Sequence, residues 1–218
     1  MTYKENNSYF LKCLDLESMG FILVGTDDET YQFKKTENKI TIFFSVTLMA
    51  NKLYGLNSWL VYDEIESMID SFMDKYQLKE VRRYPMTINF YKLRLGYSYM
   101  FEAYNTHFEN KEKIDIVVKM TKKNINEEFM PLWEKYADMQ VVNDEIIDKI
   151  PQMKLHEFIS GEMPLKKLVI MSICKNSKYD EYKNWMLGIQ EENFLNKIEG
   201  AEKDYLLTKD LVEYLETI

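Results

Sequence analysis

The residues of this chain best suited to bind an anion or a protein partner are its three arginines and the tyrosines that follow them. Arg82, Arg83 and Arg94 fall within thirteen positions, and Tyr97 and Tyr99 come directly afterwards. Arginine and tyrosine are enriched at interface hot spots, because each combines rigid contact area with polar reach. We therefore expect a partner contact or an anion pocket here. The alternative is that the arginines pair with surface carboxylates while the tyrosines pack on a sheet.

The side chains that carry most enzyme chemistry are scarce and dispersed. His107 and His156 are the two histidines, and neither has the HExxH spacing of a zinc site. Cys13 and Cys174 lie among apolar residues at helical spacing, which predicts two buried thiols. A zinc site needs three or four ligands at characteristic spacing. The sequence therefore predicts no catalytic residue and no metal site.

Motifs for phosphate binding or nucleophilic catalysis are also missing from the sequence. The seven glycines do not cluster, which excludes a phosphate-cradling loop and a dinucleotide fingerprint. No G-x-S-x-G is present. Adjacent acidic residues such as Glu127/Glu128 and Glu191/Glu192 are predicted to be solvated helix faces. We expect a protein that is not an enzyme and that uses no cofactor.

The pattern of apolar residues changes near Lys122. Before this residue, apolar and polar residues alternate with period two, as in 40–48 and 113–118, and after it apolar residues recur at helical spacing. We expect a sheet-rich part over 1–122 and a helical part over 123–218, packed as one unit. The predicted fold class is α+β: an antiparallel β-sheet with covering helices, then a helical part that contains an antiparallel helical hairpin.

Within the sheet-rich part, Ser8 is predicted to cap a first helix. An antiparallel meander of three strands should follow at 21–24, 30–33 and 40–48. A helix over 62–76 carries a clean apolar stripe and is expected to cover the sheet, with Glu66 facing water. Three further strands are predicted at 86–93, 97–104 and 114–120.

Within the helical part, Asn124 and Glu127 are placed like a capping box, and Pro131 should start or kink a helix. Helices near 164–173 and 179–189 should form the hairpin. A last helix is predicted from about Thr208.

Charge is divided unequally along the chain. Residues 1–122 carry 16 Lys+Arg against 17 Asp+Glu, a net of −1, and residues 123–218 carry 12 against 19, a net of −7. Such a charge repels nucleic acid phosphates and attracts basic proteins. Asp144, Glu145 and Asp148 are the candidate acidic face for a basic protein partner.

Apolar runs do not exceed five residues, far short of the ~20 of a membrane-spanning helix, and the N-terminus does not look like a signal peptide. We expect a cytoplasmic protein with no membrane contact. The layout resembles, as an analogy, immunity proteins of bacterial polymorphic-toxin systems, which implies inhibition of a basic toxin such as a nuclease. The alternatives are a small-ligand-binding or hydrolytic domain with an anion pocket at the arginines, and a segment that only mediates oligomerisation.

Overall fold

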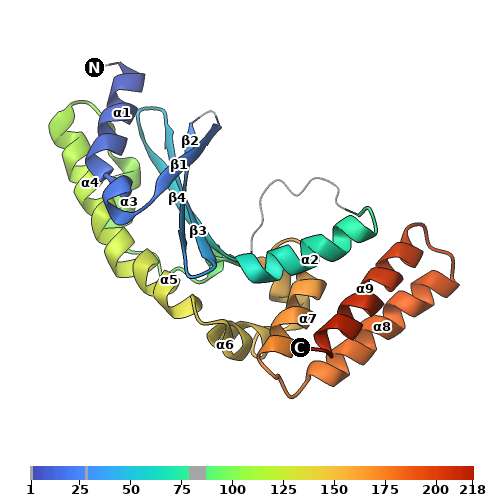
Figure 1. Ribbon diagram of the computed structural model, residues 1–218. Helices are drawn as coiled ribbons and strands as arrows, with labels where there is room; N and C mark the ends of the chain where they lie inside the picture. The colour runs from blue at the N-terminus through green and yellow to red at the C-terminus, as the bar shows by residue number, and fades with distance from the viewer. Residues whose placement is uncertain (1, 28, 79–86) are drawn as a thin grey trace. The chain divides into compact units, whose positions relative to one another are not determined.

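The computed structural model describes residues 2–27, 29–78 and 87–218 (Figure 1). Helices predominate in it, together with one antiparallel sheet, so the predicted α+β class is confirmed. The chain forms two compact units. Unit 1 comprises Met1–Val61 and Asn89–Ala137, and unit 2 comprises Tyr62–Ile88 and Asp138–Ile218. Arg82 and Arg83 lie outside the described residues.

The sheet has five strands in the order β1-β2-β3-β4-β5. Their bounds are β1 Ile22–Asp27, β2 Thr30–Glu37, β3 Ile40–Met49, β4 Lys52–Tyr62 and β5 Ile88–Asn89. The predicted meander is confirmed as β1, β2 and β3, which pair antiparallel with Phe33 opposite Phe44. Asn38 and Lys39 join β2 to β3, and both have positive φ, as a two-residue hairpin turn of the primed type requires. β4 follows a second such turn and was not predicted.

Unit 1 also contains the N-terminal helices and the helices that follow the sheet. They are α1 Tyr3–Leu14, η1 Leu16–Met19, η2 Phe90–Lys92, α3 Ser98–Asn105, α4 Lys111–Asn124, the π-helical turn η3 Ile125–Phe129 and α5 Met130–Tyr136. α1 begins after Thr2, which forms a capping box with Glu5. The predicted cap at Ser8 is therefore wrong, because this residue lies inside the helix. The expected boundary at Lys122 falls inside α4.

The strands expected at 97–104 and 114–120 are also wrong, because these segments form α3 and α4. Asn110 caps α4 by accepting a hydrogen bond from the Lys113 N–H at 3.0 Å. Part of this segment alternates in apolar character, but the side chains that α4 buries recur at helical spacing. They are Ile114, Val117, Val118, Thr121 and Asn124. Within the described residues, the strand expected at 86–93 reduces to Ile88–Asn89.

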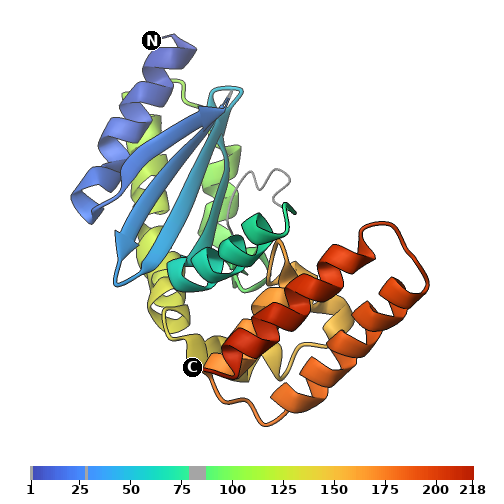
Figure 2. The same cartoon turned by 45° about the vertical axis from the view of Figure 1, so that its right-hand side comes forward.

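The core of unit 1 lies between the sheet and the helices on one of its faces (Figure 2). Phe44 of β3 is fully buried and meets the ring of Phe129 edge-to-face at 5.0 Å and that of Trp133 at 5.9 Å. The Trp133 indole N–H donates to the Ser58 hydroxyl of β4 at 2.9 Å. Aromatic packing therefore joins the sheet to η3 and α5.

Unit 2 is helical. Its elements are α2 Asp63–Lys75, α6 Met139–Val142, the π-helical turn η4 Asn143–Ile147, η5 Gln152–Glu157, α7 Met163–Ile173, α8 Tyr179–Leu195 and α9 Ala201–Leu215. α2 forms where predicted, but it belongs to unit 2, where it packs against α7 and α9. Glu66 of α2 is buried and does not face water as expected.

Two helical pairs follow one another in unit 2. α7 packs against α8, which confirms the predicted hairpin, and α8 packs against α9 (Figure 2). α9 begins at Ala201, earlier than the expected start near Thr208. None of the helices among the described residues is both long and apolar enough to span a membrane.

Candidate functional site

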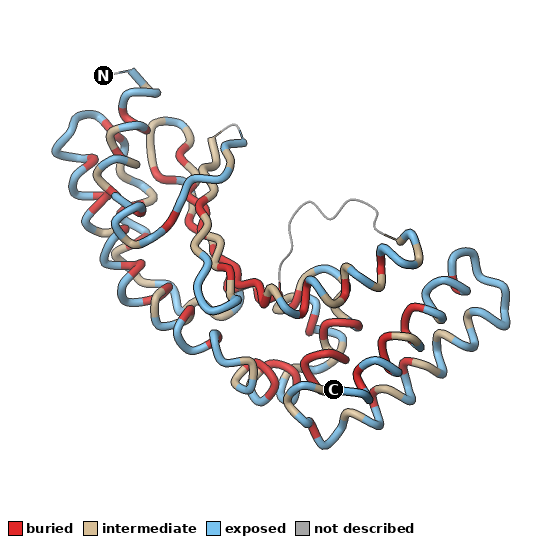
Figure 3. The backbone as a smooth tube through the Cα atoms, viewed as in Figure 1, coloured by how far each residue is buried: buried red, intermediate tan, exposed pale blue. Residues whose placement is uncertain are grey.

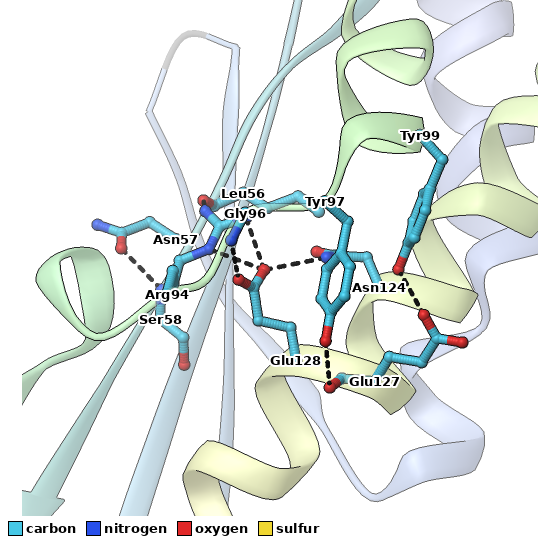
Figure 4. Close-up of polar contacts among 10 residues, drawn as sticks. All are labelled: Leu56, Asn57, Ser58, Arg94, Gly96, Tyr97, Tyr99, Asn124, Glu127 and Glu128. Atoms are coloured by element: carbon cyan, nitrogen blue, oxygen red, sulfur yellow. Dashed lines mark hydrogen bonds and ion pairs between the residues drawn. The ribbon is translucent and has the colours of Figure 1, made fainter.

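The structure places Arg94 in a network inside unit 1 (Figure 4). Its Nε and Nη2 atoms each lie 3.1 Å from Glu128 Oε2, and its Nη1 donates to the Leu56 carbonyl at 2.8 Å. The guanidinium also stacks over the Phe129 ring, 4.6 Å from its centroid. The cation of Arg94 is therefore already matched by a carboxylate of the same chain.

Glu128 is the centre of this network. Its Oε1 accepts from the Gly96 backbone N–H at 2.8 Å, and its Oε2 accepts from the Asn124 amide at 3.0 Å. The side chain is 1% exposed. Burial by itself would raise the pKa of Glu128, but the Gly96, Asn124 and Arg94 donors outweigh it and hold that pKa below its usual range. Glu128 is a buried, ionised carboxylate, so the prediction that it lies on a solvated helix face is wrong.

A π-helical turn puts Glu128 in this position. The capping box predicted at Asn124 is wrong, since α4 continues through η3 into α5 and Asn124 binds Glu128 instead. The Met130 N–H donates to the Ile125 carbonyl, five residues earlier. Pro131 follows in the first turn of α5, and because the helix is continuous here, its missing N–H removes the donor that the Glu127 carbonyl would otherwise have; the Tyr97 hydroxyl donates to that carbonyl instead. The predicted helix start at Pro131 thus falls one residue earlier, at Met130, without a break in the helical chain.

Tyr97 and Tyr99 stack on each other with ring centroids 5.3 Å apart. The Tyr97 hydroxyl donates to the Glu127 carbonyl at 3.2 Å, and the Tyr99 hydroxyl donates to Glu127 Oε2 at 3.0 Å. Burial, followed by the Glu127 carboxylate, raises the pKa of Tyr99 to about 12. The structure therefore brings Arg94, Tyr97 and Tyr99 together, but around Glu127 and Glu128. This arrangement favours a structural role for Arg94.

The low pKa of Glu128 makes the stability of unit 1 depend on pH. Because this pKa is lower in the folded chain than in the unfolded chain, its stabilisation is complete above the ordinary glutamate pKa of about 4.3. It is lost as pH falls through the folded pKa. We expect Glu128→Gln to remove this part of the acid sensitivity. Urea unfolding across this pH range, followed by tryptophan fluorescence in a Trp185→Phe background, measures it; parallel pH profiles for both proteins would contradict the expectation.

The predicted acidic face lies on η4 and just after it. Asp144 is exposed and Glu145 is half-buried. Asp148 accepts hydrogen bonds from the Asn176 amide and the Lys178 ammonium, both at 3.2 Å. Burial would raise the pKa of Asp148, but Asn176 and Lys178 more than offset it and lower that pKa. Part of the negative charge expected to face a partner is thus already paired within unit 2.

The difference in net charge is larger between the two units than between residues 1–122 and 123–218. Unit 1 has 14 Lys+Arg and 14 Asp+Glu in its sequence, a net of zero. Unit 2 has 14 Lys+Arg and 22 Asp+Glu, a net of −8. The whole net charge of the protein therefore belongs to unit 2.

Free carboxylates gather where α8 ends and α9 begins. We call residues 191–206 the hairpin tip; Figure 3 shows the connection between the two helices as exposed. Its exposed glutamates, none of which forms an ion pair with a described residue, are Glu191, Glu192, Glu199 and Glu202. Leu195 and Ile198 lie among them and are 69% and 53% exposed. The sequence indicated Glu191 and Glu192 as a solvated face, but neither Glu199 and Glu202 nor the apolar residues between them.

Stacked rings support the hairpin tip. The rings of Phe194 and Tyr205 lie almost parallel, 6° apart, with centroids 5.7 Å apart. They connect the last turn of α8 to the first turns of α9. The stacked rings thereby restrain the connection that carries Leu195 and Ile198. Because this connection is already restrained, less side-chain and loop entropy is lost when a partner binds.

The two histidines and the two cysteines lie in different elements of the fold. His107 lies between α3 and α4 and forms an isolated β-bridge with Lys52. The thiols of Cys13 and Cys174 are half-buried, not buried as expected, and burial raises the pKa of Cys174 to about 11. Among the described residues, no three His, Cys, Asp or Glu side chains are placed to hold a metal ion.

Comparison of the chain with protein-family models, with curated proteins and with solved structures gives no significant match. Its function is therefore inferred from the charge, exposure and contacts of its own residues.

Proposed function

We propose that the protein is a binding module for a basic protein, which it contacts through the hairpin tip. The observation that supports it most is that unit 2 holds the whole net charge of −8 and that its hairpin tip combines exposed Leu195 and Ile198 with exposed glutamates on either side of them in sequence, which form no ion pair with a described residue. An apolar centre inside a polar rim is the usual anatomy of a protein interface. The acidic rim would select a basic partner and speed its capture.

The partner class that we favour is a basic toxin, such as a bacterial nuclease. Neutralising a toxin requires tight binding but no catalytic group, and the same charge that attracts a basic protein repels nucleic acid. This is the function that the analogy with immunity proteins implies. It accounts for the charge of unit 2 without assigning a reactive residue.

β1 offers a second, weaker candidate surface. It is an edge strand of the sheet, and three consecutive apolar residues are exposed on it: Ile22 at 61%, Leu23 at 51% and Val24 at 46%. An exposed edge of this kind can pair with an extended segment of a partner. Unit 1 has no net charge, however, so this edge has no electrostatic preference for a basic protein.

The proposal predicts that reversing charge at the hairpin tip weakens binding. A variant with Glu191→Lys, Glu192→Lys and Glu202→Lys should recover the partner with about tenfold lower affinity. It should also lose most of the salt dependence, because the three changes bring the net charge of unit 2 from −8 to −2. The measurement is affinity capture from the native host's lysate at low and at moderate salt, quantified by mass spectrometry.

A matched control distinguishes the effect of charge at the hairpin tip from the effect of the total net charge. Glu102, Glu109 and Glu112 of unit 1 are exposed, and changing all three to lysine alters the total charge equally. This control should capture the partner as the unchanged protein does. Equal losses in both variants would show that only net charge matters, and no loss in the first variant would refute the proposed contact.

A further inference from the structure

Unit 2 contains a cavity of about 400 Å³ that is separate from the hairpin tip. It lies between the segment 147–152, α7 and the first turns of α8. Ile147 and Met171 give it apolar lining, while Lys167, Tyr182 and Trp185 add a cation and two aromatic rings. Small-molecule sites have this size, and they combine a mostly apolar lining with a few placed polar groups.

The aromatic wall of the cavity has a free face. The rings of Trp185 and Tyr182 stack with centroids 5.5 Å apart and an interplanar angle of 29°. Tyr182 is buried, and its hydroxyl donates to the Pro164 carbonyl at 3.3 Å. Trp185 remains 49% exposed. Its indole, supported from behind by Tyr182, offers a surface for a planar apolar group.

Lys167 supplies a cation to the cavity, and Asp148, which also lines it, acts on that cation only at longer range. Its ammonium group donates to Gln152 Oε1 at 2.6 Å and lies 4.3 Å from the centroid of the Tyr182 ring. Of the carboxylates that the structure describes, none comes within ion-pair distance of Lys167. Burial, followed by the charge of Lys178, lowers the pKa of Lys167. Lys178 differs, since its ammonium group is paired with Asp148 at 3.2 Å.

We infer that this cavity binds a small planar anion, whose ring stacks on Trp185 and whose carboxylate or phosphate accepts hydrogen bonds from Lys167. Such a ligand would place a negative charge in direct contact with the half-buried ammonium, and a charge-assisted hydrogen bond is stronger than a neutral one. Two carboxylates also line the cavity: Asp148 is paired with Lys178, and Glu181 is exposed to solvent. The site does not depend on the protein-binding function proposed above.

Three probes test the inference on the full chain by isothermal titration calorimetry: naphthoate, naphthamide and acetate. Naphthoate has both the ring and the charge, naphthamide has the ring alone, and acetate has the charge alone. We expect naphthoate to bind at least about tenfold more tightly than either of the others. Failure of naphthoate to bind, or equal binding of naphthamide, would overturn the inference.

Single substitutions test whether naphthoate binds in this cavity. Trp185→Ala and Lys167→Gln should each weaken naphthoate binding about tenfold, while Lys167→Arg should retain most of it. Lys149→Gln, which removes an exposed lysine of the same unit, should leave it unchanged. Equal affinities in Lys167→Gln and Lys149→Gln would place the anion elsewhere and refute the site. If Lys167→Gln does not fold, Trp185→Ala and Lys167→Arg still decide the question.

Discussion

Replacing Lys166 with methionine is expected to lower the free energy of unfolding of unit 2 by about 3–5 kcal/mol. The Lys166 ammonium lies 2.6 Å from Glu66 Oε1, and the two side chains are 1% and 6% exposed. Removing the lysine breaks this buried ion pair and takes the ammonium away from the Glu66 carboxylate. Removing one partner of a buried pair is far more costly than removing one partner of an exposed pair.

The surrounding contacts explain why this ion pair should matter. The Thr87 hydroxyl donates to Glu66 Oε1 at 2.8 Å and accepts from the Tyr62 N–H at 3.2 Å. Lys166 also donates to the Ser160 carbonyl at 2.8 Å. The pair therefore fastens α2 to α7 and to the segments around Thr87 and Ser160. These four parts of unit 2 should loosen together in the variant.

Urea unfolding read by pulsed hydrogen exchange in α7 peptides measures the effect in unit 2 alone. The double variant Glu66→Leu with Lys166→Met should recover most of the lost stability, because it replaces both charges with apolar groups. A loss below about 1 kcal/mol for Lys166→Met would show that the pair behaves like an exposed surface pair.

A second large effect is expected in unit 1, where Arg94→Leu should cost about 3 kcal/mol or more of the free energy of unfolding. Glu128 would keep its Gly96 and Asn124 donors, but it would lose its cation and both contacts from the guanidinium. The Leu56 carbonyl would lose its donor as well. Arg94→Lys should give an intermediate loss, since an ammonium group cannot reproduce the planar fork.

Pulsed hydrogen exchange in peptides of α4 and η3 measures this loss. Lys119→Leu removes an exposed cation from α4 and serves as the matched control, with little expected effect. If Arg94→Leu is as harmless as this control, Arg94 is not a structural residue. An anion pocket at Arg94 would then be the better interpretation.

The pattern of apolar residues predicted some elements of the fold correctly, but it missed or misassigned others. β1, β2 and β3 alternate in apolar character and are separated by polar turns, so their positions could be predicted. β4 follows a turn at Ala50 and Asn51, which both adopt positive φ without the glycine that usually signals such a turn. In α4, alternation over 113–118 hid the helical stripe of Ile114, Val117, Val118 and Thr121.

Only those parts of the candidate sites whose residues lie close together in sequence could be predicted. Arg94, Tyr97 and Tyr99 are close in sequence, so their proximity could be inferred, but their partner Glu128 comes 34 residues after Arg94. Glu66 lies on a helix face that the pattern assigned to solvent, and only the tertiary fold brings Lys166 to it. The hairpin tip and the cavity at Trp185 depend likewise on how α7, α8 and α9 pack.

Hydrogen exchange of the protein with and without its captured partner shows whether a basic protein binds at the hairpin tip. We expect slower exchange across residues 191–206 when the partner is bound, with β1 unchanged. Protection confined to β1 at Ile22–Asp27, with unaltered exchange at the hairpin tip, would contradict it.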